Sequence, residues 1–418
     1  MNISLGFGKG NVNMDIAEAQ IMAVLEPNTV SCDIFGEKEI RRALGNPIGT
    51  PRLKDIVKPG EKIVIVTSDI TRPMPSKLVI PPLLEELNQA GIAFSDVTVV
   101  FALGSHRKHT EAEQRYLVGD EIYSKIQCID SDSTSCIHLG VTSFGTPVDI
   151  FRTVADADRR ICLGNIEYHY FAGYSGGAKA IMPGVSTRAA IQANHSKMVL
   201  DEAKAGEMNK NPVRRDIDEV LSFVPIDFIV NVVLDEHKNI IKAVAGHPIK
   251  AHRVGCEFLD RLYKVRIKEQ ADIVVVSAGG HPKDINLYQA QKALDNARHA
   301  VRDGGIIILV ASCKEGFGEA VFEKWMKEAK APDDLIVKIQ QQFVLGGHKA
   351  AAIAVVLNKC RIYMVSDLDA DVVRKIFMKP YSHLQEALDD ALAELGADSK
   401  VMIMPYGGST LPETDAQG

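Results

Sequence analysis

Short runs of apolar, β-favouring residues alternate with helical stretches along this chain, and this alternation constrains the fold more than any other feature. The sequence predicts strands at 62–67, 97–101, 161–163, 272–277, 305–310 and 400–404. It predicts helices at 76–90, 187–204, 287–302 and 383–395. Strands separated by helices are typical of parallel sheets built from βαβ units. We therefore expect an α/β protein with largely parallel sheets.

The length of 418 residues favours two domains. A basic, polar stretch at 264–271 precedes a new series of strand, loop and helix. We therefore expect an N-terminal α/β domain at 1–268 and a C-terminal α/β domain at 269–399, with an active-site cleft between them. The final segment, 400–418, can belong to either domain and could return to the first.

Composition and charge exclude several classes of protein. The net charge is −6 and the pI is near 6.1, which disfavours a broad nucleic-acid surface. The first residues lack the pattern of a signal peptide, and no run reaches the ~18 apolar residues that cross a bilayer. The seven cysteines form no CxxC pair, which argues against a disulfide framework, a zinc ribbon or an iron–sulfur cluster. We expect a cytoplasmic protein with reduced thiols and with neither nucleic acid nor membrane as a partner.

Polar or glycine-bearing loops follow several of the predicted strands. They are SDITRP at 68–73, LGSHRKHT at 103–110, GNIEYHY at 164–170 and SAGGHP at 277–282. Ligands of open α/β sheets bind outside the carboxyl ends of the strands. The four loops therefore indicate one shared cleft, and the alternative is four unrelated loops in solvent.

Among twelve histidines, His106, His169 and His195 are the best candidates for a functional role. His169 lies in a segment, 164–186, that packs aromatic residues, glycines and Lys179 closely together. Its glycines, Gly173, Gly176 and Gly177, permit a close approach of the backbone to a ligand and could form an anion-binding nest. The segment is neither a Walker A loop, because no Ser or Thr follows Lys179, nor a GxGxxG dinucleotide fingerprint.

A helix that begins after Asn286 places polar groups on one face. Asn286 can cap it, and Tyr288, Gln289 and Lys292 follow at spacings of three and four residues. The helix dipole and the lysine would together attract a carboxylate. Arg72 could supply a second cationic contact. The alternative is an ordinary solvated helix face.

Taken together, these segments resemble the nickel-dependent lactate racemase family. The matching stretches are SDITRP (68–73), ALGSHRKHTEAE (102–113), GNIEYHYFAGYSGGAKAIMPGVS (164–186), ANHSKM (193–198) and GGHPKDINLYQAQKAL (279–294). They occur in the order typical of the family, and the resemblance covers essentially the whole chain. It implies an isomerase that interconverts the D and L enantiomers of a small 2-hydroxy acid.

The resemblance also implies a cofactor that composition cannot reveal. This is the nickel-pincer nucleotide, a pyridinium-3,5-bisthiocarboxylic-acid-derived mononucleotide that holds nickel and accepts a hydride from the substrate. Lys179 matches the lysine that is covalently attached to it, and His195 matches the histidine ligand of nickel. Asp69 matches a position that contacts the cofactor, and Gly176 and Gly177 lie in the cofactor-binding segment. Cofactor-synthesis machinery is the implied partner.

The remaining positions match the acid–base and substrate-binding residues of the family. His106 and His169 match the acid–base pair, one base for each enantiomer. The substrate-holding positions are Arg72, Tyr288, Gln289 and Lys292. The first histidine loop contains both His106 and His109, and Lys108 stands where the family usually has proline. His106 is the preferred base because it directly follows Gly104-Ser105.

Lactate is the expected substrate, and malate, an aryl-lactate or a sugar acid are the alternatives within the same chemistry. A non-catalytic nickel- or nucleotide-binding protein on this scaffold is a further alternative, and the joint presence of Lys179, His195, His106 and His169 argues against it. A nicotinamide-dependent dehydrogenase is disfavoured by the missing GxGxxG. The sequence predicts no oligomeric state.

Overall fold

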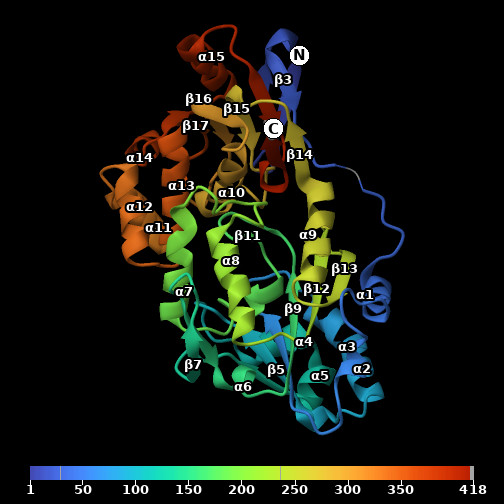
Figure 1. Ribbon diagram of the computed structural model, residues 1–418. Helices are drawn as coiled ribbons and strands as arrows, with labels where there is room; N and C mark the ends of the chain where they lie inside the picture. Colours follow the sequence, from blue (N-terminus) through green and yellow to red (C-terminus); the bar gives the residue numbers. More distant parts are fainter. Residues whose placement is uncertain (29, 236, 415–418) are drawn as a thin grey trace. The chain divides into compact units, whose positions relative to one another are not determined.

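The chain forms two compact units in the computed structural model (Figure 1), which describes residues 1–28, 30–235 and 237–414. The central unit comprises Val30–Asp260. The terminal unit combines Met1–Thr29 with Arg261–Gly418. Each unit contains one six-stranded sheet, so the predicted α/β class with largely parallel sheets is confirmed.

The sheet of the central unit has the strand order β13-β12-β9-β4-β5-β6. All neighbours are parallel except β12 and β13, which form an antiparallel pair. In sheet order the strands are β13 (Ile240–Gly246), β12 (Phe228–Leu234), β9 (Arg159–Asn165), β4 (Ile63–Ser68), β5 (Val97–Ala102) and β6 (Gln127–Asp130). This order puts β9, β4 and β5 side by side at its centre.

Apolar packing on both faces explains why the central strands read as continuous apolar runs. Ile63, Val64, Ile65 and Val66 of β4 are all buried. Alternate residues point to opposite faces, and Ile63 and Ile65 share one core with side chains of α1 and α3. The helices of this unit are α1 (Gly36–Gly45), α2 (Leu53–Ile56), α3 (Ser76–Gln89), α4 (Glu111–Val118), α5 (Asp120–Lys125), α6 (Arg152–Ala155), α7 (Arg188–His195), α8 (Pro212–Glu219) and the start of α9 (Lys250–Tyr263).

The terminal unit is built on an entirely parallel sheet with the order β18-β17-β16-β15-β19-β3. In sheet order its strands are β18 (Lys379–Tyr381), β17 (Arg361–Val365), β16 (Val301–Val310), β15 (Ala271–Ser277), β19 (Val401–Met404) and β3 (Ile21–Val24). Its further helices are α10 (Leu287–Ala297), α11 (Ala320–Glu328), α12 (Pro332–Gln341), α13 (Gly347–Lys359), α14 (Ala370–Lys375) and α15 (Leu384–Leu395). Smaller pairs are the hairpin β1 (Asn2–Phe7) and β2 (Gly10–Asp15), and the parallel pair β14 (Lys264–Ile267) and β20 (Leu411–Thr414).

The structure divides the chain differently from the sequence boundaries 1–268 and 269–399. Residues 1–29 group with the C-terminal half because β3 pairs with β19, and Leu5 and Met14 of the β1–β2 hairpin are buried against the terminal sheet. The second boundary falls at 260/261, inside α9. The last expected strand lies between β15 and β3 in the terminal unit, so it does not return to the central one.

The predicted elements are confirmed except at two helix ends. All six expected strands are present, and helices occupy 76–89 and 384–395. The helix expected at 187–204 stops at His195 and continues as a short 3-10 turn, Ser196–Val199. The helix expected at 287–302 ends at Ala297, because β16 already begins at Val301. In the described part of the chain, no helix has both the length and the apolar character needed to cross a membrane.

Candidate active site

Three of the four predicted loops leave one edge of the central sheet. The loop 68–73 follows β4, the loop 103–110 follows β5, and the loop 164–170 follows β9. These strands are adjacent and parallel, so their carboxyl ends meet at the same edge. The fourth loop, 277–282, follows β15 in the sheet of the terminal unit. The central edge is therefore the candidate active site, and one cleft shared by all four loops stays a prediction.

His106 and Asp69 form a close pair at this edge. The ring nitrogen Nδ1 of His106 lies 2.5 Å from Oδ2 of Asp69. The hydroxyl of Thr71 donates to the other oxygen, Oδ1, at 2.8 Å. Because a carboxylate only accepts hydrogen bonds, the hydrogen of a neutral His106 lies on Nδ1 and the lone pair is on Nε2. The side chain of His106 is 26% exposed, so a base is available at the surface of the site.

The carboxyl group of Asp69 is held in its charged form. Burial alone would raise the pKa of Asp69, but the hydrogen bond and charge of His106, the hydroxyl of Thr71 and the charge of Arg72 together lower it. An ionised Asp69 keeps the His106 ring in one orientation and one tautomer. This arrangement of a carboxylate behind a histidine is the one that orients general bases in hydrolases.

His109 has both ring nitrogens engaged within the protein. Its Nδ1 lies 2.6 Å from Oδ1 of Asp130, and its Nε2 accepts the backbone N–H of Ile70 at 3.0 Å. The side chain is only 1% exposed. His109 therefore anchors the loop that carries Asp69 and Arg72, whereas His106 faces a polar hollow of about 90 Å³ that it lines together with Ser105. This geometry favours His106 over His109 as the base.

The ring of Phe171 brings three predicted residues together. Its centroid lies 4.5 Å from the ring of His169, 4.9 Å from the ring of His195 and 5.9 Å from Nζ of Lys179. His169 lies on β10 (Tyr168–His169), which pairs with β11 (Gly173–Tyr174), so the chain folds back on itself around Phe171. His195 is the last residue of α7. Residues from three places in the sequence thus surround one aromatic side chain.

His169 and Lys179 both lie in surroundings that disfavour positive charge. Desolvation first, and then the positive charges of Lys179, Arg72, His195 and Arg214, hold the pKa of His169 well below its ordinary value. Desolvation, followed by the charges of Arg214 and Arg72, likewise lowers the pKa of Lys179 well below that of a free lysine. A neutral amine is a nucleophile, so Lys179 is suited to forming a covalent bond.

The glycines of the segment 173–177 are required by packing within the protein. Gly176 and Gly177 have φ values of +76° and +60°. A Cβ atom at Gly176 would lie 2.8 Å from Oδ1 of Asn231, and one at Gly177 would lie 2.9 Å from the ring of His252. The backbone N–H of Gly177 donates to Asn231. Neighbouring side chains therefore account for these glycines, and an anion-binding nest and cofactor contacts at Gly176 and Gly177 stay predictions.

The remaining predicted residues lie on α10 in the terminal unit. Asn286 caps this helix as expected, because its side chain accepts the N–H of Gln289 at 3.0 Å. Nζ of Lys349 donates to the backbone oxygen of Tyr288 at 2.5 Å and lies 4.1 Å from the centre of its ring. Gln289 and Lys292 are exposed. The helix and its cap are confirmed, and substrate binding by this face stays a prediction.

Comparisons with known proteins show which family this chain belongs to. A family model described as the lactate racemase N-terminal domain matches residues 7–207, and one described as the lactate racemase C-terminal domain matches residues 267–411. The lactate racemase of Thermoanaerobacterium thermosaccharolyticum is 35% identical over 98% of this chain and 99% of that protein. The lactate racemase of Lactiplantibacillus plantarum is 33% identical over 89% of each chain. The chain belongs to the lactate racemase family.

Solved structures agree with this assignment. The apoprotein of the T. thermosaccharolyticum lactate racemase has a TM-score of 0.87, and the match covers 99% of this chain and 100% of that one. A protein from Thermotoga maritima, 18% identical, has a TM-score of 0.61 over 91% of this chain and 97% of its own, which shows the fold alone. As a member of this family, the protein is an isomerase of the racemase class.

Within residues 1–28, 30–235 and 237–414, no group of three or more His, Cys, Asp or Glu side chains could hold a metal ion. A metal at His195 would therefore need most of its ligands from another molecule. His195 and Lys179 both lie against Phe171, and a nickel ion and an attached cofactor at these residues stay predictions.

Sequence reasoning missed the residues that support this site. Phe171 is the shared contact of the three predicted side chains, and Arg214 is fully buried and donates to the backbone oxygens of Ala172 and Tyr174. Asn231 and His252 pack against the glycine turn. Arg214, Asn231 and His252 lie outside the conspicuous motifs, so their contacts appear only in the folded chain. Phe171 lies within the segment 164–186. Its position in the sequence between His169 and His195 could have indicated that it contacts both.

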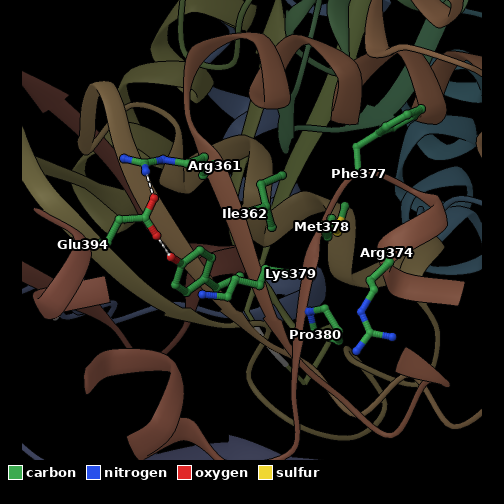
Figure 2. A pocket seen from close by; sticks show the side chains of 9 residues that line it. Arg361, Ile362, Arg374, Phe377, Met378, Lys379, Pro380 and Glu394 are labelled. Atoms are coloured by element: carbon green, nitrogen blue, oxygen red, sulfur yellow. Dashed lines mark hydrogen bonds and ion pairs between the residues drawn. The ribbon is translucent and has the colours of Figure 1, made fainter. Parts of the chain in front are cut away.

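A larger hollow of about 380 Å³ in the terminal unit carries none of the predicted residues (Figure 2). It lies beside β17 and β18, and its charged side chains are paired. Figure 2 shows Arg361 pointing toward Glu394, with which it forms an ion pair. Lys379 and Arg374 pair with Asp390 and Asp371. This hollow therefore gives no reason to place the chemistry there.

Proposed function

We propose that this protein racemises lactate, or a closely similar small 2-hydroxy acid, in the cytoplasm, with a nickel-pincer nucleotide supplied by cofactor-synthesis machinery. The observation that supports this most strongly is the grouping of His169, His195 and Lys179 around Phe171, at the sheet edge that also holds His106 and Asp69. These residues are an acid–base pair, a metal donor and a reactive amine.

The chemistry of racemisation explains why two bases are needed. A Cα hydrogen beside a carboxylate is very weakly acidic, so its removal as a proton is costly. Its removal as a hydride, while a base takes the hydroxyl proton, gives a 2-keto acid whose new carbonyl group carries no charge. When bound, the cofactor would accept this hydride and return it to the opposite face of the keto acid. One base must then serve each enantiomer, and His106 and His169 fill these two positions.

The residues of this chain would bind the substrate and move its proton. Nε2 of His106 carries the lone pair that receives a hydroxyl proton, and Asp69 stabilises the imidazolium that forms. Arg72 and Lys292, with Tyr288 and Gln289, are proposed to hold the carboxylate while the carbonyl group turns. Lys179 and His195 would hold the cofactor through its covalent bond and its nickel ion, and Asp69, Gly176 and Gly177 would contact it.

A chiral assay tests the proposed reaction. Protein produced together with the cofactor-synthesis machinery is incubated with D- and L-lactate, malate, an aryl-lactate and a sugar acid. We expect both lactate enantiomers to reach the same mixture without added nicotinamide. Turnover of malate or another acid in preference to lactate would revise the substrate. In a parallel incubation with added nicotinamide cofactor, stoichiometric consumption of that cofactor would instead indicate the dehydrogenase.

The covalent role of Lys179 is tested by the intact mass of the holo-protein. Wild type should carry an adduct that the Lys179→Ala variant lacks. An equal adduct on the variant would contradict the assignment.

The metal role of His195 is tested by nickel content. His195→Ala should lose bound nickel while it keeps its circular dichroism spectrum, because imidazole is a suitable nickel ligand. Full retention of both nickel and activity would remove His195 from the site.

The carboxylate contacts are tested by kinetics. Arg72→Lys and Lys292→Met should each raise KM by about 10-fold or more, which corresponds to ~1.4 kcal/mol per tenfold. A misplaced keto acid would also lower kcat. Unchanged kinetics in both variants would contradict carboxylate binding by Arg72 and Lys292.

A further inference from the structure

Behind His195 lies a chain of buried polar side chains that the proposed function does not use. Asn194, the preceding residue on α7, is fully buried. Its Oδ1 lies 2.9 Å from Nδ1 of His195. Its Nδ2 donates to Oδ2 of Asp216 at 2.9 Å and to the backbone oxygen of Val213 at 3.2 Å. Asp216 lies on α8 and is itself fully buried.

The two partners of Asn194 determine which way its amide points. A carboxylate and a backbone carbonyl only accept hydrogen bonds, so the NH₂ group of Asn194 must face Asp216 and Val213. The carbonyl oxygen Oδ1 is then the atom that faces His195. Because Oδ1 only accepts, Nδ1 of His195 must carry a hydrogen. Nε2 is consequently the nitrogen with the lone pair.

Further hydrogen bonds keep Asp216 in place. Its oxygens accept the hydroxyls of Thr142 at 2.7 Å and Thr146 at 2.5 Å, and Nζ of Lys197 lies 3.2 Å away. A carboxylate with this many donors cannot turn without leaving buried groups unsatisfied, which is unfavourable. Asp216 therefore fixes the orientation of the Asn194 amide, and the amide in turn fixes the hydrogen-bonding state of the His195 imidazole.

We infer that Asn194, held by Asp216, is a positioning residue that fixes the hydrogen of His195 on Nδ1 and so presents Nε2 to a metal ion. This inference rests on the proposed function in naming nickel as that ion. Histidine ligands of metals generally donate their second N–H to such a partner, and loss of the partner costs about 10–100-fold in metal affinity. Free imidazole side chains carry the hydrogen mainly on Nε2, so the protein has to impose the tautomer.

The tautomer itself is measured on the full-length protein before the cofactor is added. With ¹⁵N-labelled histidine at pH 8, the long-range ¹H–¹⁵N pattern of His195, assigned from its loss in His195→Gln, should show the hydrogen on Nδ1 alone. A hydrogen on Nε2 in wild type would overturn the inference without any variant. This measurement does not depend on the activity of the loaded enzyme.

Three variants separate orientation from general stability. Asn194→Leu removes the acceptor and should populate the Nε2–H tautomer and weaken nickel retention by about 10–100-fold. Asn194→Asp keeps an oxygen that can face Nδ1 and should retain the wild-type tautomer with a smaller loss of nickel than Asn194→Leu, although it removes the donor to Asp216 and Val213 and so destabilises the fold. Thr146→Val, the matched control, removes a buried hydrogen bond to Asp216 but leaves the bond between Asn194 and His195 intact. It should destabilise the fold without changing the tautomer or lowering nickel retention more than a few-fold.

The outcomes distinguish this inference from the proposed function. If His195→Ala loses nickel while Asn194→Leu retains it as wild type does, the positioning role of Asn194 is overturned. Equal losses in Asn194→Leu, Asn194→Asp and Thr146→Val would also overturn it, because they would reflect stability alone. If the tautomer shifts in Asn194→Leu but even His195→Ala keeps its nickel, the orientation of His195 by Asn194 stands and the proposed metal site falls.

Discussion

The two proposed bases lie in opposite electrostatic surroundings, although the strands that precede them, β5 and β9, flank the same strand β4 of one sheet. His106 has the buried carboxylate of Asp69 at 2.5 Å from its Nδ1. The surroundings of His169 lower its pKa through desolvation and then through the charges of Lys179, Arg72, His195 and Arg214. A carboxylate faces the ring of His106, whereas desolvation and nearby cationic groups disfavour a positive charge on His169.

The tautomers differ as well. Nδ1 of His106 donates to Asp69, so its lone pair is on Nε2. Nδ1 of His169 accepts the backbone N–H of Ala172 at 3.3 Å, which places the hydrogen of the neutral ring on Nε2. Two bases that serve mirror-image substrates are therefore not mirror images of one another. In the state that the structure describes, the lone pair of a neutral His106 is on Nε2, whereas that of the neutral His169 ring is on Nδ1.

The largest expected effect comes from removing either histidine. His106→Gln and His169→Gln should each lower net racemisation of holo-protein by about 10²–10⁴-fold, because both lie on the same reversible path. The measurement is the rate of approach to the racemic mixture from each enantiomer. Retention of more than a tenth of the wild-type rate in either variant would show that the pair does not act as proposed.

Replacement of Asp69, whose carboxylate contacts His106, should lower kcat by a nearly comparable factor. Asp69→Asn preserves shape but removes the charge and allows the ring of His106 to adopt the other tautomer, so kcat should fall by about 10²-fold or more. Thr71→Val, the control, removes the hydroxyl bond to Asp69 and a longer 3.4 Å contact with Nδ1 of His106 but leaves the carboxylate in place, so it should cost less than about 10-fold. If both variants lost activity equally, loop packing rather than the charge of Asp69 would be responsible.

Replacement of His109 should reduce the stability of the fold more than it reduces catalysis. His109→Gln leaves Asp130 and the N–H of Ile70 poorly satisfied and should lower the free energy of unfolding by about 1–3 kcal/mol, with roughly a 10-fold fall in kcat. The control Gln114→Leu removes another bond to Asp130 without affecting the loop 69–72. A loss of activity as large as in His106→Gln, without a loss of stability, would transfer the catalytic role to His109.

The smallest effect concerns pH and stability. The folded chain resists protonation of His169, whereas the unfolded chain binds that proton below a pKa of about 6.5. Unfolding is therefore favoured progressively as the pH falls below this value, and the contribution is absent above it. His169→Gln should reduce the stability lost between pH 7 and pH 5 by an amount on the order of 1 kcal/mol. Parallel denaturation curves for variant and wild type would argue against the neutral environment of His169.

Local patterns predicted the strands of the central site and the loops that follow them, but not all elements of the chain. Apolar runs located all six expected strands, and polar loops after β4, β5 and β9 indicated where His106 and His169 would lie. The rule that ligands bind at the carboxyl ends of parallel strands then placed these loops together. This placement requires only that successive βαβ units lie next to each other in the sheet, which is the common case.

Local sequence patterns could not predict which strands pair when those strands lie far apart in the sequence. The four residues of β3 are too short a strand to be distinctive, and in their partner β19 the residue paired with Ile21 is Val401, 380 positions away. The electrostatic difference between His106 and His169 has the same origin. Asp69 is 37 residues from His106 and Arg214 is 45 residues from His169, so neither environment can be recognised from the sequence next to the histidine.

The most direct test of the central claim, that His106 and His169 serve opposite enantiomers, is a single-turnover measurement. Holo-protein in excess is mixed with one pure enantiomer of lactate, and enzyme-bound 2-keto acid is quantified after quenching. We predict that His106→Gln and His169→Gln each still oxidise one enantiomer, and that the two variants fail on opposite enantiomers. Failure of both variants on the same enantiomer would contradict the account.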